Sequence, residues 1–180
     1  MRYIAVMLIF LQSVVWGYTY NELLLDAQSR IYPKILMLQE GIGAKHKNMP
    51  VVFTVVYEPE DEYAAERVVE KIEAYYDHGL GGIPFEAEMA TFDELDPSLH
   101  SDAFYILKGS DEDMEKAVEF AMREKIPVFV YDFKDLKYGA LFALTIEQST
   151  VIYMNRVSLH KTGVLFTPSL YSIVRFVDEK

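Results

Sequence analysis

The sequence predicts an α/β fold: a single-domain layered sandwich with a mainly parallel sheet, a C-terminal antiparallel hairpin and helices on both faces. Short apolar stretches such as VVFTVVY (51–57) and IPVFVYD (126–132) are typical of strands buried on both faces. Amphipathic stretches of helical length separate these strands, which is typical of parallel sheets. The chain has 180 residues, 51% of them hydrophobic, which suits one domain with a substantial core.

The first predicted helix lies within YNELLLDAQSRIYPKILMLQEGIG (20–43), where Asn21 can cap its start. We expect Pro33 to kink or divide this helix, and Gly41 and Gly43 to end it. The segment KHKN (45–48) is expected to be an exposed basic turn. The predicted buried stripe of the helix consists of Leu24, Ala27, Ile31, Ile35 and Leu38.

A strand is predicted at Val51–Tyr57, followed by a helix within EDEYAAERVVEKIEAYYDHGLGG (60–82). Its acidic first turn suits the helix dipole. The next stretch, IPFEAEMATF (83–92), alternates and predicts a half-buried strand with Glu86 and Glu88 on one face. The predicted inner stripe of the helix is Ala64, Val68, Ile72 and one of Tyr75 or Tyr76.

The central part predicts a strand at Ala103–Leu107 and a helix from Ser110, which can cap it, with Asp113 at the capping-box position. The helix stripe is Met114, Ala117, Val118, Ala121 and Met122. After the strand in IPVFVYD, two strands, ALFALTI (140–146) and TVIYMN (150–155), form a predicted hairpin. A short helix over 157–161 and a last helix opened by Thr-Pro (167–168) complete the chain.

The N-terminus, MRYIAVMLIFLQSVVWGYTYNE, predicts a signal peptide over residues 1–17, cleaved after Gly17, and an α/β domain over 18–180. Arg2 precedes an apolar run that is short for a membrane span, and no stop-transfer pattern follows. An uncleaved anchor and a buried first strand are the alternatives. There is no Cys, which excludes disulfides, thiolate catalysis and a lipoprotein anchor. We therefore expect a periplasmic protein that does not span the membrane after cleavage.

Charge and motifs argue against several functions. The net charge of -11 is unfavourable for binding nucleic acid or an anionic membrane surface. The glycine-rich stretches EGIGAKHK (40–47) and HGLGGIP (78–84) lack the strand–loop–helix context of a phosphate site. No serine has the context of a nucleophile, and Ser110 is explained as a helix cap. The histidines show no ligand spacing and are expected to be solvated: His46, His78, His100 and His160. We predict no catalytic, cofactor-binding or metal-binding residues, and therefore no enzyme.

Tyr75 and Tyr76 are the candidate functional residues. They are adjacent on a predicted helix, about 100° apart, so at most one can face fully inward. Surface aromatic residues suit a protein interface, whereas partly buried tyrosines suit the core. We predict both as protein-interface residues, with core packing as the alternative. A homodimer is also compatible with the sequence.

The C-terminal part, ALFALTIEQSTVIYMNRVSLHKTGVLFTPSLYSIVRFV (140–177), resembles the C-terminal portion of the YfiR family of periplasmic proteins. Family members end in a hairpin, a short polar helix, a turn with Gly, a serine-rich cap and a last apolar helix. The matching positions are Asn155, Val157–Lys161, Gly163-Val164, Thr167 with Ser169, and Leu170, Ile173 and Val174. Looser matches are ELLLDAQSRIYPKILML (22–38), VVFTVVYEPED (51–61), SDAFYILKGSDEDMEKAV (101–118) and KIPVFVYD (125–132).

The resemblance implies a non-enzymatic regulator that binds and represses an inner-membrane signalling protein. That partner would be a diguanylate cyclase or a sensor histidine kinase, bound through its periplasmic region, and release would raise cyclic di-GMP and biofilm formation. The family's Trp-Pro after the first helix and its cysteines are absent here, so redox control is not implied.

The alternative is a periplasmic solute-binding component of an ABC-type transport system. SDAFYILKG (101–109) and KIPVFVYDFKDLKYGALFAL (125–144) resemble the second half of such a protein. Solute-binding proteins of this kind close two lobes around a cleft. The 180 − 17 = 163 residues after the predicted cleavage are few for two such lobes. A small hydrolase is a third reading, and the missing catalytic constellation counts against it.

Overall fold

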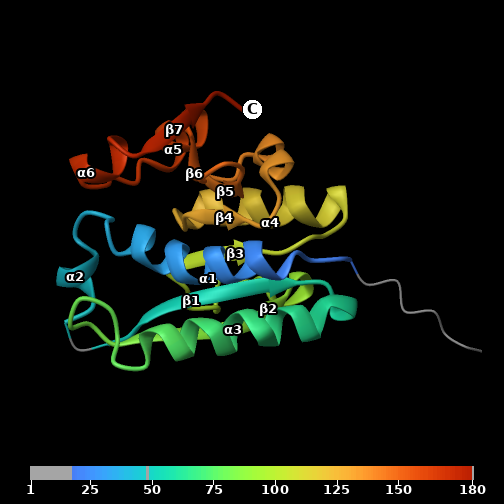
Figure 1. Ribbon diagram of the computed structural model, residues 1–180, viewed down its shortest axis with the longest axis horizontal. Coiled ribbons are helices and arrows are strands. Elements are labelled where there is room, and N and C mark those ends of the chain that lie inside the picture. Colours follow the sequence, from blue (N-terminus) through green and yellow to red (C-terminus); the bar gives the residue numbers. More distant parts are fainter. Residues whose placement is uncertain (1–17, 48, 180) are drawn as a thin grey trace, which may run out of the picture.

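A single sheet organises the computed structural model, which describes residues 18–47 and 49–179 (Figure 1). Its strand order is β2-β1-β3-β4-β5-β6-β7. Neighbours from β2 to β5 are parallel, β6 is antiparallel to β5, and β7 is parallel to β6. The predicted mainly parallel sheet and C-terminal hairpin are confirmed. The strands are β1 (Val51–Tyr57), β2 (Phe85–Thr91), β3 (Ala103–Ile106), β4 (Val128–Val130), β5 (Phe142–Ile146), β6 (Thr150–Asn155) and β7 (Val174–Val177).

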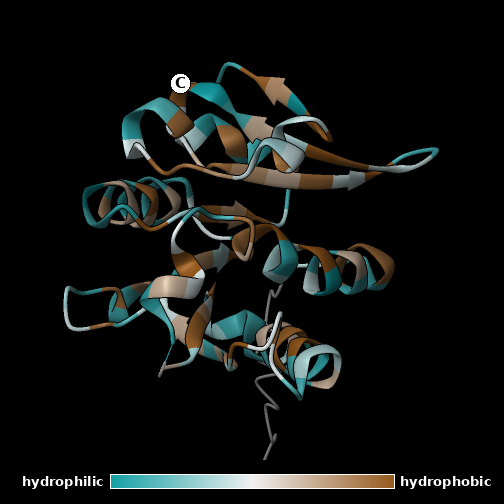
Figure 2. Ribbon diagram, turned by 90° about the vertical axis from the view of Figure 1, so that its left-hand side faces the viewer, coloured by the Kyte–Doolittle hydropathy of each residue, from teal (hydrophilic) through white to brown (hydrophobic). Residues whose placement is uncertain are grey.

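Helices cover both faces of the sheet, as the sequence predicts. The α-helices are α1 (Glu22–Leu36), α2 (Ile42–Lys45), α3 (Glu62–Tyr76), α4 (Asp111–Glu124), α5 (Arg156–Thr162) and α6 (Pro168–Tyr171). Three 3₁₀ helices join them: η1 (Pro59–Asp61), η2 (Phe92–Glu94) and η3 (Phe133–Tyr138). Helices α1 and α3 share one core with side chains such as Phe53, whereas α4 shares the other with Phe104. In Figure 2 hydrophobic residues concentrate on the strands and on the helix stretches against them.

The buried face of α1 differs from the predicted stripe. The cap is confirmed, because Asn21 Oδ1 accepts a hydrogen bond from the Leu24 N–H at 3.0 Å. Gln28 lies in the core, where its Nε2 donates to the carbonyls of Tyr131 at 2.9 Å and Leu144 at 3.3 Å. These bonds offset the cost of burying an amide. The buried residues are Leu25, Gln28, Ser29, Tyr32, Pro33, Ile35 and Leu36, so only Ile35 of the predicted stripe is fully buried.

The expected effects of Pro33, Gly41 and Gly43 are also corrected. Pro33 lies inside one continuous helix that ends at Leu36. The Pro33 ring removes one backbone N–H donor from the helix. In the preceding turn, the Ser29 hydroxyl donates a hydrogen bond to the Leu25 carbonyl at 2.8 Å. Gly41 adopts a left-handed conformation (φ 83°) that starts α2, and Gly43 lies within α2.

The stripes of α3 and α4 largely agree with prediction. In α3 the buried residues are Ala65, Val68, Ile72 and Tyr76. In α4 they are Met114, Ala117, Val118, Phe120 and Ala121. Ser110 caps α4 by accepting from the Asp113 N–H at 3.2 Å. Asp113 does not complete the predicted capping box: its carboxylate accepts the Ser110 hydroxyl, and Glu58 accepts the Ser110 N–H at 3.2 Å.

The predicted last helix is wrong beyond its first turn. The helix α6 has only four residues, and the chain then forms strand β7 beside β6. Ile173, expected on the apolar face, is 61% exposed, and Val174 begins the strand. Paired to a neighbouring strand, the backbone groups of β7 gain hydrogen bonds that a frayed helix end would leave to water. The short helix predicted over 157–161 is confirmed as α5, with Gly163 left-handed at its end (φ 66°).

Candidate functional site

The carboxyl ends of β1, β3 and β4 meet at one edge of the sheet, which we call the carboxyl edge. Glu58, Lys108 and Tyr131 follow these strands directly or one residue later. Strand β2 lies on one side of β1 and strand β3 on the other, so the strand order changes direction at this point. Open α/β sheets bind ligands outside the carboxyl ends of their strands at such a switch. The topology therefore makes this edge the first place to look for a site.

Residues Tyr18–Asn21, which we call the edge segment, lie across the carboxyl edge and are bonded to it. The Tyr18 N–H donates to Asp61 Oδ1 at 3.0 Å, and the Tyr20 hydroxyl donates to Asp61 Oδ2 at 2.6 Å. The Lys108 N–H donates to the Tyr20 hydroxyl at 3.1 Å. The Asn21 N–H donates to the Tyr131 hydroxyl at 2.7 Å. The segment is thus tied to the chain that follows each of the three strands.

Three tyrosine rings surround the ammonium group of Lys108, and we call them the tyrosine cage. The Lys108 Nζ lies 5.6 Å from the ring centre of Tyr18 and 5.3 Å from those of Tyr20 and Tyr131. It also donates to the Thr19 carbonyl at 2.9 Å. Cations over aromatic rings at such distances are attracted by the ring quadrupole. The cage is therefore a binding site for an ammonium group, and a side chain of the protein fills it.

Two buried carboxylates act on the cage electrostatically: burial raises the pKa of Tyr18, and the charges of Asp61 and Asp135 add to this effect. Asp61 is 3% exposed and Asp135, from η3, is 6% exposed. Asp61 accepts from the backbone nitrogen of Tyr18 and from the Tyr20 hydroxyl, and neither aspartate forms a side-chain ion pair within the part of the chain that the structure describes. Burial, with the nearby Asp132 charge adding to it, raises the pKa of Asp135 to about 6. A buried titratable group with a raised pKa in such a place is typical of functional sites.

A pocket of about 260 Å³ opens beside the edge segment, between the starts of α1 and α3. It is lined by Tyr18, Tyr20, Glu22, Leu25, Glu60, Asp61, Tyr63, Ala64 and Arg67. Its lining combines aromatic rings with charged groups of both signs. The edge segment is a wall shared by the pocket and the tyrosine cage, so a molecule in the pocket would lie next to the cage.

The amino edge of the sheet has a second pocket, of about 420 Å³, and it corrects the prediction for His46. This ring is 4% exposed and packs under α2 rather than in a solvated turn. Its Nδ1 lies 2.8 Å from the Pro50 carbonyl, and its Nε2 lies 2.9 Å from Asp102 Oδ1. The pocket is lined by Lys45, His46, Met49, Pro50, Val52, His100, Ser101 and Asp102.

The polar groups of this second pocket serve one another. Asp102 also accepts from the Lys45 ammonium at 2.7 Å and from the Val52 N–H at 3.0 Å. Both nitrogens of His46 and both oxygens of Asp102 are therefore in use. The network fixes α2 against the starts of β1 and β3, and we assign it a structural role.

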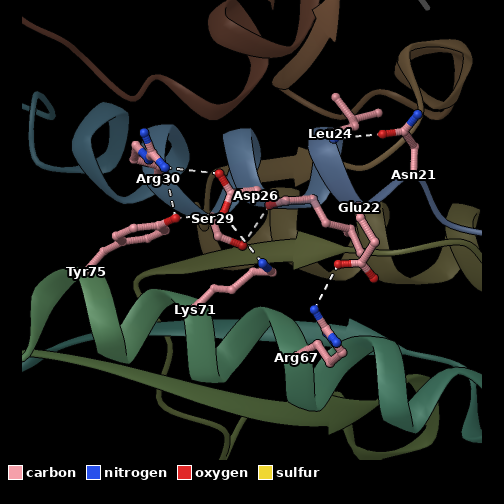
Figure 3. Close-up of polar contacts among 10 residues, drawn as sticks. Asn21, Glu22, Leu24, Asp26, Ser29, Arg30, Arg67, Lys71 and Tyr75 are labelled. Atoms are coloured by element: carbon pink, nitrogen blue, oxygen red, sulfur yellow. Dashed lines mark hydrogen bonds and ion pairs between the residues drawn. The ribbon is translucent and has the colours of Figure 1, made fainter.

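The structure places Tyr75 and Tyr76 between α3 and α1. Tyr76 is 8% exposed and its hydroxyl donates to the Arg30 carbonyl, so it belongs to the core. Tyr75 is 37% exposed; its hydroxyl donates to Asp26 at 2.6 Å and accepts from Arg30 at 2.9 Å. As Figure 3 shows, Lys71 joins the same carboxylate of Asp26, at 3.4 Å. The hydrogen bond from Tyr75, with Lys71 and Arg30 adding their charges, lowers the pKa of Asp26.

The two tyrosines thus differ as predicted, one inward and one partly exposed. Their role in a protein interface stays a prediction, and the burial of Tyr76 favours Tyr75 as the residue that could serve it.

The other motifs lie apart from the carboxyl edge. His78, Glu86 and Glu88 are solvent-facing, as expected, and Ser110 caps α4. Residues 1–17, with the predicted signal peptide, lie outside the described residues.

The sequence analysis did not identify Lys108, Asp61 or Asp135. A signal was present: Lys108 follows AFYIL and Tyr131-Asp132 ends IPVFVYD, so both stand where buried parallel strands end.

Among residues 18–47 and 49–179, no group of three or more His, Cys, Asp or Glu side chains could hold a metal ion. The helices described there include none long and apolar enough to cross a membrane.

No family model matches the chain, and no curated protein matches it. Three solved structures share its fold. A conserved domain protein from Vibrio cholerae has a TM-score of 0.58 at 13% identity, with 84% of this chain and 59% of that one covered. The ABC domain in complex with L-Trp from Streptococcus pneumonia has a TM-score of 0.53 at 14% identity, with 81% of this chain and 61% of that one covered. The third is the ligand-free, open structure of CD0873 from Clostridium difficile, a substrate binding protein with adhesive properties. It has a TM-score of 0.54 at 16% identity, with 82% of this chain and 59% of that one covered.

These similarities define a class of fold, the α/β fold found in substrate-binding proteins. At 13–16% identity they show the fold alone. The chain spans about three fifths of the length of each of these proteins.

Proposed function

We propose that this protein is a non-catalytic, extracytoplasmic binding protein of the substrate-binding type, with its ligand site at the carboxyl edge. The observation that carries the proposal is the juxtaposition of the tyrosine cage, two buried carboxylates and a pocket of about 260 Å³ at the switch in strand order. Two proteins of similar fold support it, since one was solved with L-Trp and the other is described as a substrate binding protein. Because the chain spans only part of their length, its ligand is inferred from its own residues.

Location outside the cytoplasm is part of the proposal. The similar fold of substrate-binding proteins and the predicted signal peptide support it. The periplasm is the compartment that the sequence favours. Fractionation of cells and N-terminal sequencing of the purified protein would test both the compartment and cleavage after Gly17.

The comparisons favour a binding protein of the substrate-binding type over the regulator predicted from the YfiR resemblance. No family model matches, and two of the similar solved structures are described as an ABC domain bound to L-Trp and as a substrate binding protein. Repression of a diguanylate cyclase or sensor kinase therefore stays a prediction, which a cyclic di-GMP measurement in a deletion strain would test.

A ligand screen tests the proposed function. Purified protein would be mixed with amino acids, amines, sugars and organic acids, and thermal unfolding would be recorded. A ligand of the proposed site should raise the melting temperature by mass action. Tyr63→Ala, which removes a 69% exposed ring from the pocket, should abolish that rise.

The matched control is Ile173→Ala, which removes an exposed apolar side chain (61%) between α6 and β7. It should leave the rise unchanged. A ligand that stabilises Tyr63→Ala as well as the wild type would place binding elsewhere and refute the site. Chemical conversion of the ligand would refute the non-catalytic assignment.

A further inference from the structure

The carboxylates of the carboxyl edge are not all paired among the described residues. The lysines closest to Asp135 have other partners: Lys134 pairs with Asp132 at 3.3 Å, and Lys137 with Asp111 at 3.8 Å. Lys108 is held by the tyrosine cage and a carbonyl. Asp135 is 6% exposed and forms no side-chain hydrogen bond in the described part of the chain, and its carboxylate oxygens retain some contact with solvent. The carboxylate that lacks a direct partner among the described residues of this edge is thus Asp135.

Two further carboxylates, Asp61 and Glu58, add negative charge at this edge. Asp61 is 3% exposed and accepts hydrogen bonds from the Tyr18 nitrogen, which becomes an α-ammonium if the chain is cleaved after Gly17, and from the Tyr20 hydroxyl. Glu58 accepts the Ser110 N–H at 3.2 Å, and burial raises its pKa. Carboxylates gathered at one edge favour a positive charge nearby, and the Lys108 ammonium already acts on Asp135 in this way. The complementary ligand is therefore a cation.

The surroundings select the kind of cation. A metal ion would need several oxygen ligands converging on one point, and the described residues contain no such group. The edge instead offers aromatic ring faces and a carbonyl, which suit an alkylammonium group. The ammonium group of Lys108 already occupies such a position. The neighbouring pocket of about 260 Å³ has room for the remainder of a small molecule.

We propose that the ligand of the carboxyl edge is a small organic amine whose ammonium group replaces that of Lys108 in the tyrosine cage, beside Asp61 and Asp135. The proposal rests on the proposed function and names its class of ligand. Lys108 acts as an internal competitor that occupies the cage when the ligand is absent. On ligand binding its side chain moves to solvent, which it already partly contacts.

Binding of the amine should depend on the charge of Asp135. The ionisable groups that bear on this carboxyl are Asp132, Lys134, Lys137 and Lys108. The pKa of Asp135 is raised to about 6 by burial, so it is charged at pH 7.5 and mostly protonated at pH 5. Affinity for an amine should fall between these values, because the amine itself stays protonated throughout.

Removing the internal competitor provides the test. The variant Lys108→Met keeps the length of the side chain and removes its charge. The probe is n-butylammonium, followed through tyrosine ring signals in nuclear magnetic resonance spectra. We expect Lys108→Met to bind it about tenfold more tightly than the wild type does, which corresponds to the ~1.4 kcal/mol of one cation–aromatic interaction. The uncharged n-butanol should bind neither protein.

Three further variants make the result decisive. Lys116→Met, which removes an exposed lysine paired to Glu112, should show no gain. Lys108→Arg keeps a charged occupant and should also show none, while reporting that substitution at this position is compatible with folding. Adding Tyr131→Leu to Lys108→Met should abolish the gain. No gain in folded Lys108→Met, or a gain that survives Tyr131→Leu, would overturn the proposal.

These outcomes are separable from those of the ligand screen. A screened ligand without an amine that requires Tyr63 would support the proposed function and refute the amine class. If Lys108→Met binds n-butylammonium more tightly but the screen finds no ligand of the wild type, the tyrosine cage is supported as an amine site. The proposed function as a binding protein is then refuted.

Discussion

The Tyr20 hydroxyl donates a hydrogen bond to Asp61 Oδ2 at 2.6 Å, which joins the edge segment to the start of α3. The Tyr20 hydroxyl oxygen also accepts a hydrogen bond from the Lys108 N–H at 3.1 Å. One hydroxyl therefore satisfies a buried carboxylate and a backbone donor at once, and burial with this bond raises the pKa of Tyr20 well above its usual value.

Tyr20→Phe should lower the free energy of unfolding by about 1–3 kcal/mol, because it leaves a buried carboxylate and an N–H short of a partner. Urea unfolding followed by circular dichroism would measure the change. Tyr18→Phe is the matched control, since among the described residues the Tyr18 hydroxyl makes no hydrogen bond. Equal effects of the two substitutions would contradict the role given to the Tyr20 hydroxyl.

Asp135→Asn should stabilise the protein at pH 7.5 and have little effect near pH 4. The pKa of Asp135 is raised from 3.8 to about 6, so its contribution to stability is present below pH 4 and is lost as pH rises through 6. The amide avoids that loss, by about 1–2 kcal/mol after allowance for solvent screening. Melting temperatures of both proteins across this pH range provide the measurement, and a gain that does not grow with pH would contradict the charge-based explanation.

Gln28→Leu should destabilise the core by about 1–3 kcal/mol despite the apolar replacement, because it removes the partner of two carbonyls and of the Tyr105 hydroxyl. Chemical unfolding would measure this loss. Gln148→Leu, at the exposed hairpin turn, should change stability by less than ~0.5 kcal/mol. A neutral effect of Gln28→Leu would mean that water or a rotated side chain replaces the amide.

Asp102→Ala should cost about 3 kcal/mol, since Asp102 is the common acceptor of Lys45, His46 and the Val52 N–H. The exposed Asp178, paired with Arg156, offers the comparison: Asp178→Ala should cost no more than ~1 kcal/mol. Guanidinium unfolding of the two variants tests the contrast. If Asp102→Ala were as mild as the control, the amino-edge network would not hold α2 in place.

The sequence predicts most elements of the fold because their burial follows simple periodicity. VVFTVVY forms β1 over its whole length, and four of the five predicted stripe residues of α4 are buried. The face of α1 could not be read in this way, because Gln28 and Ser29 are buried polar residues whose partners are distant or backbone atoms. Nothing local in KHKN indicates that His46 would meet Asp102, 56 residues later.

The C-terminal strand and the site escaped prediction for a related reason. Val174–Val177 is short, and its pairing to β6 depends on a neighbour that only the tertiary fold supplies. The tyrosine cage combines Tyr18, Tyr20, Lys108 and Tyr131, which meet only because parallel strands end at a common edge. Its members carry no motif, and strand order had to be known first.

The position of Tyr18 has a practical consequence for handling the protein. Any affinity tag, dye or surface linker joined just ahead of this residue would emerge beside the aromatic rings around Lys108. The opposite terminus is anchored elsewhere, by the contact between Arg156 and Asp178 at 2.8 Å. Biosensor chips should therefore carry the molecule by its C-terminus, so that analytes in the flowing buffer have free access to the proposed ligand site.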